Sequence, residues 1–513
     1  MKKAYFNYLG ETKNLNKIWN FSIGSCHAYT LLRADLREQL KIAHDECGFK
    51  YIRFHGIFMD QMHVVDRDVD GKLIFSFFNI DNIYDYLISI GVKPFIELSF
   101  MPEVLASEHS YVFRYKGNTT PPKNYAEWDY FIENFVKHLI QRYGLKEVQS
   151  WFFEVWNEPN LGGDINNYNT GFFFGTQEDY FKLYEHTARA IKNIEPSLKV
   201  GGPATSNNQW IEEFIEFTKK SNVPLDYIST HHYPSDVIFG DNCEGGLEFK
   251  RLMNDVKTSE DKVKAYAEFN KFKSKLWKYI PKFTPISMSQ KVRKESKDYP
   301  LFYTEQSSLS GIDSDGEFGA SYIVEINLRN MDNCDGYSYW CLSDIFEEGF
   351  QHSKEFNGGF GLFTYHGIKK ASYNAYHLLN KLDGQMLTSI YEDDSLTIRV
   401  IKGETKDFVV ITNYDGLDKD VPNLKVNVTL GDFKGTIKRI NRYVIDKSHS
   451  NSLREYEKQS YSSDYLSNDE IQDLKDKTDL YKEEFKDYKI NQNNLELNTE
   501  INGQAVVLLE IIK

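Results

Sequence analysis

Short apolar runs alternate with longer amphipathic stretches between about residues 15 and 380. Eight of these runs have the length and composition typical of strands, and they lie at 21–26, 51–57, 93–99, 150–156, 198–203, 226–232, 301–305 and 337–342. Several are apolar almost throughout, as expected for parallel strands that are buried on both faces. The alternation predicts repeated βα units around a parallel sheet.

The stretches between the runs have the period of amphipathic helices. Apolar residues recur at i, i+3, i+4 and i+7 in 126–143, at Trp128, Phe131, Ile132, Phe135, Val136, Leu139, Ile140 and Tyr143. Leu36, Leu40, Ala43 and Cys47 repeat the pattern after the first run. Eight such units predict an α/β fold of the (β/α)8 TIM barrel type. A doubly wound open sheet is the alternative, but no GxGxxG motif follows the first strand.

The pattern changes after about residue 382. Short β-branched runs at 395–401, 407–413, 423–430 and 436–444 are typical of antiparallel strands in a sandwich. A charged, helix-compatible stretch covers 452–488, and a last strand pair ends in AVVLLEII. We therefore predict a catalytic barrel at 15–380 and a β-rich, sandwich-like accessory domain at 381–513 with a charged helical insertion. Residues 1–14 are expected to add an edge strand to the second domain.

Charge and composition narrow the classes of partner. The chain has 513 residues and a net charge of −14, which disfavours nucleic acid as a partner. No apolar run approaches the roughly 20 residues of a membrane span, so no membrane partner is expected. The N-terminus has no apolar segment of signal-peptide length, which favours the cytoplasm. Five scattered cysteines, Cys26, Cys47, Cys243, Cys334 and Cys341, form no CxxC pair and fit a reducing compartment.

Two glutamates follow strands that lie on opposite sides of the predicted barrel. The fourth run ends in WFFEVWNEPN, which contains Glu158, and the seventh ends in LFYTEQSS, which contains Glu305. Reactive residues of TIM barrels gather at these strand ends. Paired carboxyl groups hydrolyse glycosides, one as proton donor and one at the anomeric carbon, and retention needs a separation of about 5–5.5 Å. One glutamate at a strand end is more often structural, but the facing pair is specific.

Ten stretches in order along residues 20–380 resemble glycoside hydrolase family 39, the β-xylosidase family of clan A. They are GSCHAYTLLRADLREQL, GFKYIRFHGIFMDQM, GVKPFIELSFMPEVLAS, YKGNTTPPKNYAEW, WNEPNL, YFKLYEHTARAIK, VGGPAT, YISTHHYPSD, YSYWCLSDIFEE and NGGFGL. The resemblance implies that Glu158 is the acid/base and Glu305 the nucleophile. It also implies that Asn157 binds the sugar 2-hydroxyl and that Tyr233, with His231 close by, donates to the nucleophile.

The same resemblance implies further residues of the site. Arg53 would lie beside the nucleophile and lower its pKa, and His55 would contact sugar hydroxyls. Trp340 would form an apolar wall under the sugar ring, whereas core packing is its alternative role. Glu347 and Glu348 would accept hydrogen bonds from the sugar, although such a pair is otherwise typical of a solvated turn.

Metal and cofactor sites are not expected. His231 and His232 have no third ligand at useful spacing, so we predict no metal and no cofactor.

Two departures from the family concern the leaving-group side. Gln306 stands where many relatives have an aromatic residue, and the segment LGGDINNYNTGFFFGTQ is expanded, with Phe172–Phe174 as candidates for that side.

We therefore expect an exo-acting β-xylosidase that releases xylose from xylo-oligosaccharides by double displacement, with a small oligosaccharide or aryl glycoside as its partner. A β-glucoside or an α-L-arabinoside is the alternative substrate. An α-L-iduronidase is disfavoured, because Glu347 and Glu348 would repel the carboxylate of its substrate. A non-catalytic carbohydrate-binding barrel would not need both carboxyl groups. Relatives that form tetramers imply a homo-oligomer.

Overall fold

The computed structural model describes the chain apart from residues 163–170, 240–243, 255, 257–260, 262, 263, 266, 267, 270, 273–275, 277, 278, 309–314, 350–353, 417–419 and 462. Cys243 and residues 163–170 of the expanded segment after WNEPN lie outside the described residues.

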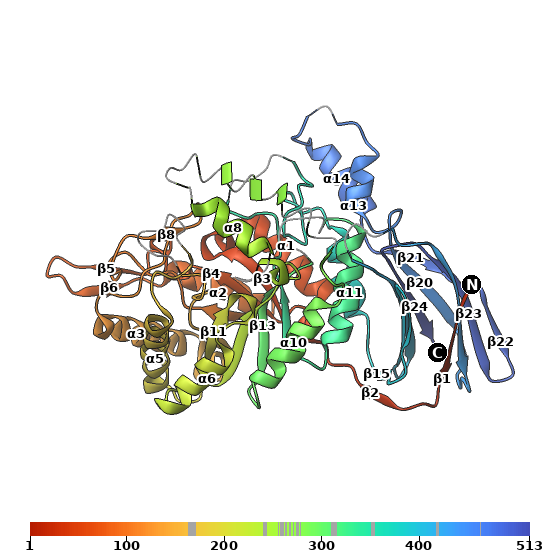
Figure 1. Cartoon of the computed structure of the whole chain (residues 1–513), viewed down its shortest axis with the longest axis horizontal. Helices are drawn as coiled ribbons and strands as arrows, with labels where there is room; N and C mark the ends of the chain where they lie inside the picture. Colours follow the sequence, from red (N-terminus) through yellow and green to blue (C-terminus); the bar gives the residue numbers. More distant parts are fainter. Residues whose placement is uncertain are drawn as a thin grey trace.

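Eight parallel strands close into a barrel, which confirms the predicted fold (Figure 1). In chain order they are β3 (Ser22–His27), β4 (Tyr51–His55), β7 (Lys93–Glu97), β10 (Phe152–Glu154), β11 (Lys199–Thr205), β12 (Tyr227–His231), β13 (Leu301–Gln306) and β14 (Gly336–Tyr339). Each overlaps one of the predicted runs. The barrel closes because β14 pairs in parallel with β3, through Tyr339 and Ile23.

Helices surround the barrel on its outside. They are α1 (Ala34–Cys47), α2 (Phe78–Ser89), α3 (Tyr125–Tyr143), α4 (Leu145–Val148), α5 (Gln177–Ile194), α6 (Ile211–Lys220), α7 (Asp236–Phe239), α8 (Glu244–Asn254), α10 (Thr284–Glu295), α11 (Glu317–Asn330) and α12 (Ala371–Asn380). Helix α3 buries the stripe from Trp128 to Leu139, as its period predicts. Its N-cap residue is Asn124, whose side chain accepts a hydrogen bond from the backbone N–H of Ala126. Within the described residues, no helix is long and apolar enough to cross a membrane.

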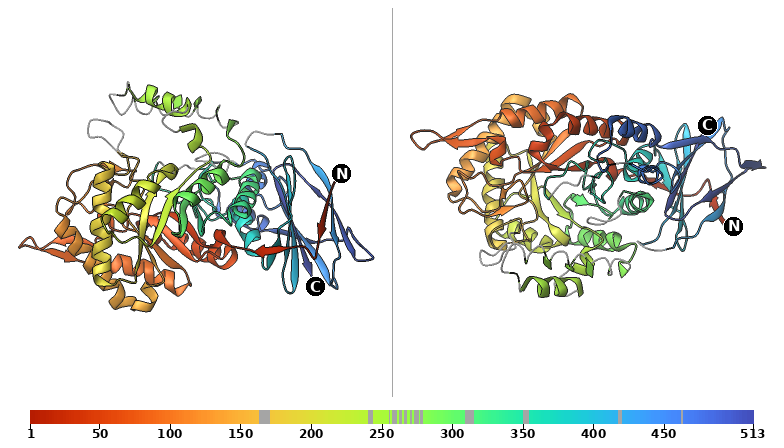
Figure 2. Two further views of the ribbon diagram at one scale, coloured as in Figure 1. Left: turned by 60° about the horizontal axis from the view of Figure 1, so that its bottom comes forward. Right: turned by 90° about the horizontal axis from the view of Figure 1, so that it is seen from above.

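The C-terminal part forms two packed sheets at one end of the molecule (Figure 2). One sheet has the order β1-β19-β23-β22, with bounds Lys2–Asn7, Leu424–Gly431, Asn494–Ile501 and Tyr488–Asn491. The other has the order β2-β15-β17-β18-β24-β20-β21, with bounds Thr12–Asn14, Gln385–Leu387, Leu396–Lys402, Lys406–Asn413, Ala505–Ile512, Arg439–Ile445 and Tyr481–Glu484, and β16 (Tyr391–Asp393) pairs with β17. The first residues of the chain thus pair with this part. The domain limits at 15–380 and 381–513 stay a prediction.

The charged stretch at 452–488 contains two helices as far as residue 477 and a strand after them. It contains α13 (Ser452–Glu457) and α14 (Asn468–Lys477), and then joins the sheets through β21 and β22. The expectation of one helical stretch is therefore wrong at its C-terminal end, because β21 pairs with β20 and Arg442 of β20 binds Glu483 at 2.6 Å. Helices α13 and α14 bury Ile471 and Leu474 against Phe356 and Ile368, which lie in the segment after β14.

Helix α11 is buried along its length because it lies between the barrel and the second sheet (Figure 1). Its Glu325 accepts hydrogen bonds from Nη1 and Nη2 of Arg399 in β17, at 2.8 and 3.0 Å, and from the hydroxyl of Thr412 in β18. Burial alone would raise the pKa of Glu325, but Arg399 lowers it to about 2. The ion pair is therefore charged at neutral pH and ties the sheet to the barrel.

Two hairpins extend from the loops at the ends of the strands. Hairpin β5 (Val65–Arg67) and β6 (Leu73–Phe75) projects from the barrel (Figure 1). Hairpin β8 (Tyr111–Val112) and β9 (Gly117–Asn118) follows β7. This second hairpin lies over the mouth of the barrel, as its contacts show below.

Candidate active site

Glu158 and Glu305 lie together at the mouth of the barrel. Glu158 follows β10 in a turn where Trp156 and Glu158 both have positive φ, 73° and 43°, and its backbone N–H donates to the carbonyl of Ala204 at 2.9 Å. Glu305 is the fifth residue of β13. An oxygen of one carboxyl group lies within 4.8 Å of an oxygen of the other. This proximity fits direct attack by one carboxylate, for which retaining enzymes hold the two groups about 5–5.5 Å apart.

Arg53 of β4 connects the nucleophile candidate to the floor of the barrel. Its Nη1 donates to Glu305 Oε1 at 2.8 Å, and its Nη2 donates to Asn157 Oδ1 at 2.9 Å. It also binds Glu97 at 2.9 Å and Glu154 at 2.5 Å, and its side chain is fully buried. The guanidinium group therefore fixes one face of Glu305 and the orientation of the Asn157 amide.

His231 ends β12 and Tyr233 follows it, and both side chains contact the carboxyl pair. The hydroxyl of Tyr233 donates to Glu305 Oε2 at 2.9 Å. His231 Nδ1 lies 3.1 Å from Glu158 Oε1 and 3.6 Å from Glu305 Oε2. Glu305 thus receives donors on both oxygens, from Arg53 and Tyr233, whereas Glu158 is contacted by the imidazole of His231 and by the Ser206 hydroxyl and has no guanidinium contact.

Burial raises the pKa of both carboxyl groups. It raises that of Glu158 to about 7. It also raises the pKa of Glu305, and Arg53 opposes the increase. Arg53 lowers the pKa of the nucleophile, as expected, but desolvation outweighs the guanidinium charge and the net shift is upward. Since the donors of Arg53 and Tyr233 stabilise ionised Glu305, the pair keeps its shared proton on Glu158.

Two buried glutamates complete the charge network, and sequence reasoning missed both. Glu97 ends β7 and Glu154 ends β10, and the two are direct neighbours in the sheet. Each lies inside an apolar run, KPFIE or WFFEV, where an acidic residue needs a buried partner. An acidic residue inside an apolar strand is therefore the sequence signal for a buried ion pair.

His55 of β4 lies between carboxylates. Its Nδ1 lies 2.7 Å from Glu97 Oε2, and its Nε2 lies 3.5 Å from Glu348 Oε1 and 3.8 Å from Glu305 Oε1. Burial opposes a charge on this imidazole, but the carboxylates outweigh it and raise the pKa of His55 to about 10. His55 is therefore an imidazolium that neutralises part of the negative charge of the site.

In the loop after β14, the side chains of Glu347 and Glu348 have different partners. Glu348 lies beside His55 with its side chain 17% exposed, whereas Glu347 turns away and binds His27 Nε2 at 2.8 Å. Hydrogen bonding to His27 lowers the pKa of Glu347. Only Glu348 is therefore in contact with the groups around Glu305.

Trp340 lies beside His55, with 4.8 Å between the two ring centroids. Its backbone N–H donates to the carbonyl of Gln306 at 2.7 Å. A Cβ atom at Gly24 would lie 2.5 Å from the indole, so glycine in β3 makes room for this ring. Trp340 is nearly buried, at 3% exposure, between Gly24 of β3 and His55 of β4.

Two other candidates face away from the pair. The Gln306 side chain points outward to Tyr376 of α12, at 3.3 Å, so our expectation that it shapes the leaving-group side was wrong. His232 Nε2 bonds the Tyr337 hydroxyl at 2.6 Å, and its ring stacks on Tyr303 behind the sheet.

Aromatic rings line the opening of the pocket. Phe113, in the turn of hairpin β8–β9, stacks at 6.0 Å over His55 and lies 5.0 Å from Phe172. The hairpin reaches across the mouth, because the backbone N–H of Arg114 donates to the carbonyl of Glu348 at 2.9 Å. Of the three phenylalanines at 172–174, Phe172 thus joins the rim, whereas Phe173 is buried against Trp156.

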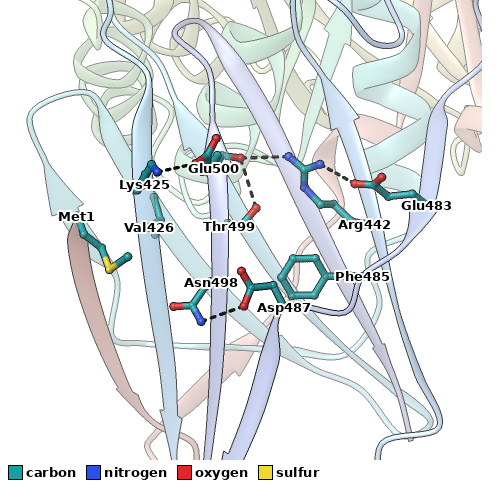
Figure 3. A pocket seen from close by; sticks show the side chains of 10 residues that line it. All are labelled: Met1, Lys425, Val426, Arg442, Glu483, Phe485, Asp487, Asn498, Thr499 and Glu500. Atoms are coloured by element: carbon teal, nitrogen blue, oxygen red, sulfur yellow. Dashed lines mark hydrogen bonds and ion pairs between the residues drawn. The ribbon is translucent and has the colours of Figure 1, made fainter.

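Glu158, His231 and Glu305 are also the one group of potential ligand atoms that lie within 4.8 Å of one another in the described part of the chain. All three atoms already take part in the contacts given above. We assign no metal to this group. A separate cavity of about 450 Å³ lies in the two-sheet part, and its cations Lys425 and Arg442 are paired with Glu500 and Glu483 (Figure 3). It contains no residue of the barrel.

Comparisons with known proteins agree with this geometry. The sequence profile of glycosyl hydrolases family 39 matches residues 7–494. The chain is 41% identical to a β-xylosidase of Caldicellulosiruptor saccharolyticus over 99% of its length and 98% of that protein, and 33% identical to a β-xylosidase of Geobacillus stearothermophilus over 86% and 82%. The crystal structure of a monomeric β-xylosidase from Caulobacter crescentus CB15 matches with a TM-score of 0.80 and 31% identity, over 100% of this chain and 99% of the other.

Proposed function

The chain belongs to glycosyl hydrolases family 39, and from this membership we propose that it is a retaining, exo-acting β-xylosidase with Glu158 as acid/base and Glu305 as nucleophile. One observation carries the assignment of roles. Two buried carboxyl groups have oxygens within 4.8 Å of each other, and only Glu305 is bound by a guanidinium and a phenol, at 2.8 and 2.9 Å.

The proposed reaction has two displacements. In the first, Glu158 gives its proton to the glycosidic oxygen while Glu305 attacks the anomeric carbon, so that the bond to the leaving group breaks and a glycosyl ester forms. The ester removes the charge of Glu305, which lets the pKa of Glu158 fall. In the second, Glu158 takes a proton from water, the water oxygen attacks the anomeric carbon, and the ester bond breaks. The released sugar keeps the configuration of the substrate.

The residues around Glu305 supply a site for one sugar unit. We propose that the Asn157 amide donates to the 2-hydroxyl, a bond that strengthens toward the transition state. His55 and Glu348 offer a charged donor and acceptor for the other hydroxyls, and Trp340 packs against the ring. The place of Glu347 beside His27 supports an indirect role, through the loop that carries Glu348.

Hairpin β8–β9 supports exo-action. Its backbone binds the loop of Glu348, and its Tyr115 stacks at 4.1 Å on His27, the last residue of β3. The hairpin follows β7 and thus contacts the neighbouring ends of β14 and β3, beside His55. A site covered on this side favours a chain end over the middle of a polysaccharide.

Xylose is favoured because the two relatives described above are β-xylosidases and align over most of the chain. A β-glucoside or an α-L-arabinoside remains the alternative. An iduronate substrate is disfavoured by Glu348, which would face its carboxylate without a free cation among the groups described above. A non-catalytic binding protein would not need a carboxyl group held near a pKa of 7 next to an ionised one.

We expect kcat/KM for 4-nitrophenyl β-D-xyloside to exceed that for the β-D-glucoside and the α-L-arabinoside by about tenfold or more, because the pocket must exclude the hydroxymethyl group by shape. Xylotriose reduced at its end should yield xylose and xylobiitol as first products. Equal or faster hydrolysis of the glucoside or arabinoside would refute the xylosidase assignment, and release of xylitol first would refute attack from the non-reducing end.

The cytoplasmic location and the homo-oligomer also stay proposals. One relative is described as monomeric, so the assembly of this chain requires its own measurement, by light scattering after gel filtration.

A further inference from the structure

Three buried side chains connect the acid/base to the floor of the barrel through hydrogen bonds. The hydroxyl of Thr304 lies 2.9 Å from Glu154 Oε1 and 3.0 Å from His231 Nε2. On the other side of the imidazole ring, His231 Nδ1 lies 3.1 Å from Glu158 Oε1. Thr304 and His231 are at most 1% exposed, and Glu154 is fully buried, so no solvent competes for these contacts.

A β-bulge brings Thr304 into this position. Thr230 and His231 of β12 pair with Tyr303 and Glu305 of β13, so that Thr304 is the extra residue between them. The bulge lets two successive side chains, Thr304 and Glu305, face the same interior, which a regular strand does not allow. The bulge between β12 and β13 therefore places the Thr304 hydroxyl within hydrogen-bond distance of His231.

The direction of each hydrogen bond follows from the number of donors. Thr304 has one hydroxyl proton, and Glu154 accepts it, since this carboxylate is also bound by Arg53 Nε at 2.5 Å. Thr304 must then accept from His231, which places the imidazole proton on Nε2. A neutral imidazole has one N–H, so Nδ1 presents a lone pair to Glu158.

From this geometry, and resting on the proposed function, we infer that Thr304 is a positioning residue. It fixes His231 in the tautomer whose Nδ1 lone pair faces Glu158, and this lone pair holds the proton that the acid/base donates. Thr304 does not touch the substrate and acts only through the imidazole.

The tautomer would serve both displacements. Burial lowers the pKa of His231 to about 4, so the ring is neutral when the enzyme works near pH 7. In the first displacement the Nδ1 lone pair accepts from protonated Glu158. In the second it faces the Glu158 carboxylate, and repulsion between the two makes that carboxylate a stronger base toward water. With the proton on Nδ1 instead, the ring would stabilise the carboxylate and weaken both roles.

Other charged groups also act on Glu158 and must be held constant in a test. The cations are Arg53 and His55. The acids and phenol that face it are Glu97, Glu305, Glu348, Asp236 and Tyr233. None of them is changed by a substitution at Thr304, and Thr304 itself carries no charge. A change of the pH profile therefore reports on the tautomer rather than on a lost charge.

The test compares Thr304→Val, which keeps the shape and removes the hydroxyl, with Thr304→Ser, which keeps the hydroxyl. Without an acceptor at Nε2, the valine variant should move the proton to Nδ1. We expect the basic limb of its kcat/KM profile to shift about one unit toward lower pH, with roughly tenfold slower xylobiose cleavage above that limb. The serine variant should keep the wild-type profile. Thr218→Val is the matched control, because it removes a buried hydroxyl that bonds only the Ile215 carbonyl in α6.

A second measurement needs no change at Thr304 and no active enzyme. Nitrogen-15 NMR of histidine-labelled wild-type protein, with His231 assigned by comparison with His231→Asn, reports which ring nitrogen carries the proton. Protonated Nε2 with unprotonated Nδ1 at pH 7 supports the inference, and protonated Nδ1 overturns it. A valine profile that matches wild type, or a serine variant as shifted as valine, also overturns it. Because the NMR result needs no substrate, failure of this inference is distinct from failure of the proposed activity.

Discussion

Replacing Glu305 by alanine is expected to lower turnover of aryl β-xylosides by a factor on the order of 10⁵, because no other described group near the anomeric carbon can form the ester. The fold should survive. Arg53 keeps its contacts with Glu97 and Glu154, and only the Tyr233 hydroxyl and one guanidinium nitrogen lose a buried acceptor. Steady-state rates and thermal unfolding of the same preparation measure the two effects.

Azide distinguishes a missing nucleophile from a damaged site. The small anion fits the space of the lost carboxylate and should attack the activated β-xyloside from that face, which yields the α-xylosyl azide. Glu392→Ala, which removes a half-exposed carboxylate of β16, is the control and should keep wild-type activity. Near-normal turnover of Glu305→Ala, or a β-azide from it, would contradict the assignment of the nucleophile.

Replacing Glu158 by alanine is expected to cause a loss that depends on the leaving group. Xylobiose needs a proton on its departing oxygen, and its kcat/KM should fall by about 10⁴-fold. The dinitrophenolate of 2,4-dinitrophenyl β-xyloside leaves without protonation. The kcat/KM for this substrate should therefore fall by less than about tenfold. Its second displacement lacks a base, so dinitrophenol should appear in a burst while the glycosyl-enzyme accumulates.

The azide product again reports the face of attack. In Glu158→Ala the anion enters on the acid/base side and attacks the glycosyl-enzyme, so the product should be the β-xylosyl azide. The opposite products of the two variants place the two carboxyl groups on opposite faces of the sugar. A uniform loss across leaving groups, with no burst, would exclude Glu158 as the proton donor.

The barrel was predictable because its signals are local. Each strand is an apolar run and each helix, such as α3, has its own buried stripe, so errors in one element do not affect the next. The segment at 481–491 gave no such signal. YKEEFKDYKIN is charged enough for an exposed helix, and it becomes β21 and β22 only because β20 and β23 offer unpaired edges. Tertiary pairing decides its conformation.

The carboxyl pair was predictable from topology alone, since strand number places Glu158 and Glu305 across one opening. The network below them was not, because Glu97 and Glu154 are hidden in runs that otherwise indicate core. The outward direction of Gln306 depends on the bulge at Thr304, which a sequence pattern cannot show. The raised pKa of Glu305 depends on how far burial outweighs Arg53, and this balance requires coordinates.

The central claim is that Glu158 and Glu305 act as a pair that hydrolyses a β-xyloside with retention. Proton NMR during hydrolysis of xylobiose by the wild-type enzyme tests it most directly, because the anomeric protons of α- and β-xylose are resolved before mutarotation equilibrates them. The carboxyl separation predicts that β-xylose appears first and converts slowly to the α-anomer. Initial release of α-xylose would mean a single displacement by water and would contradict the account.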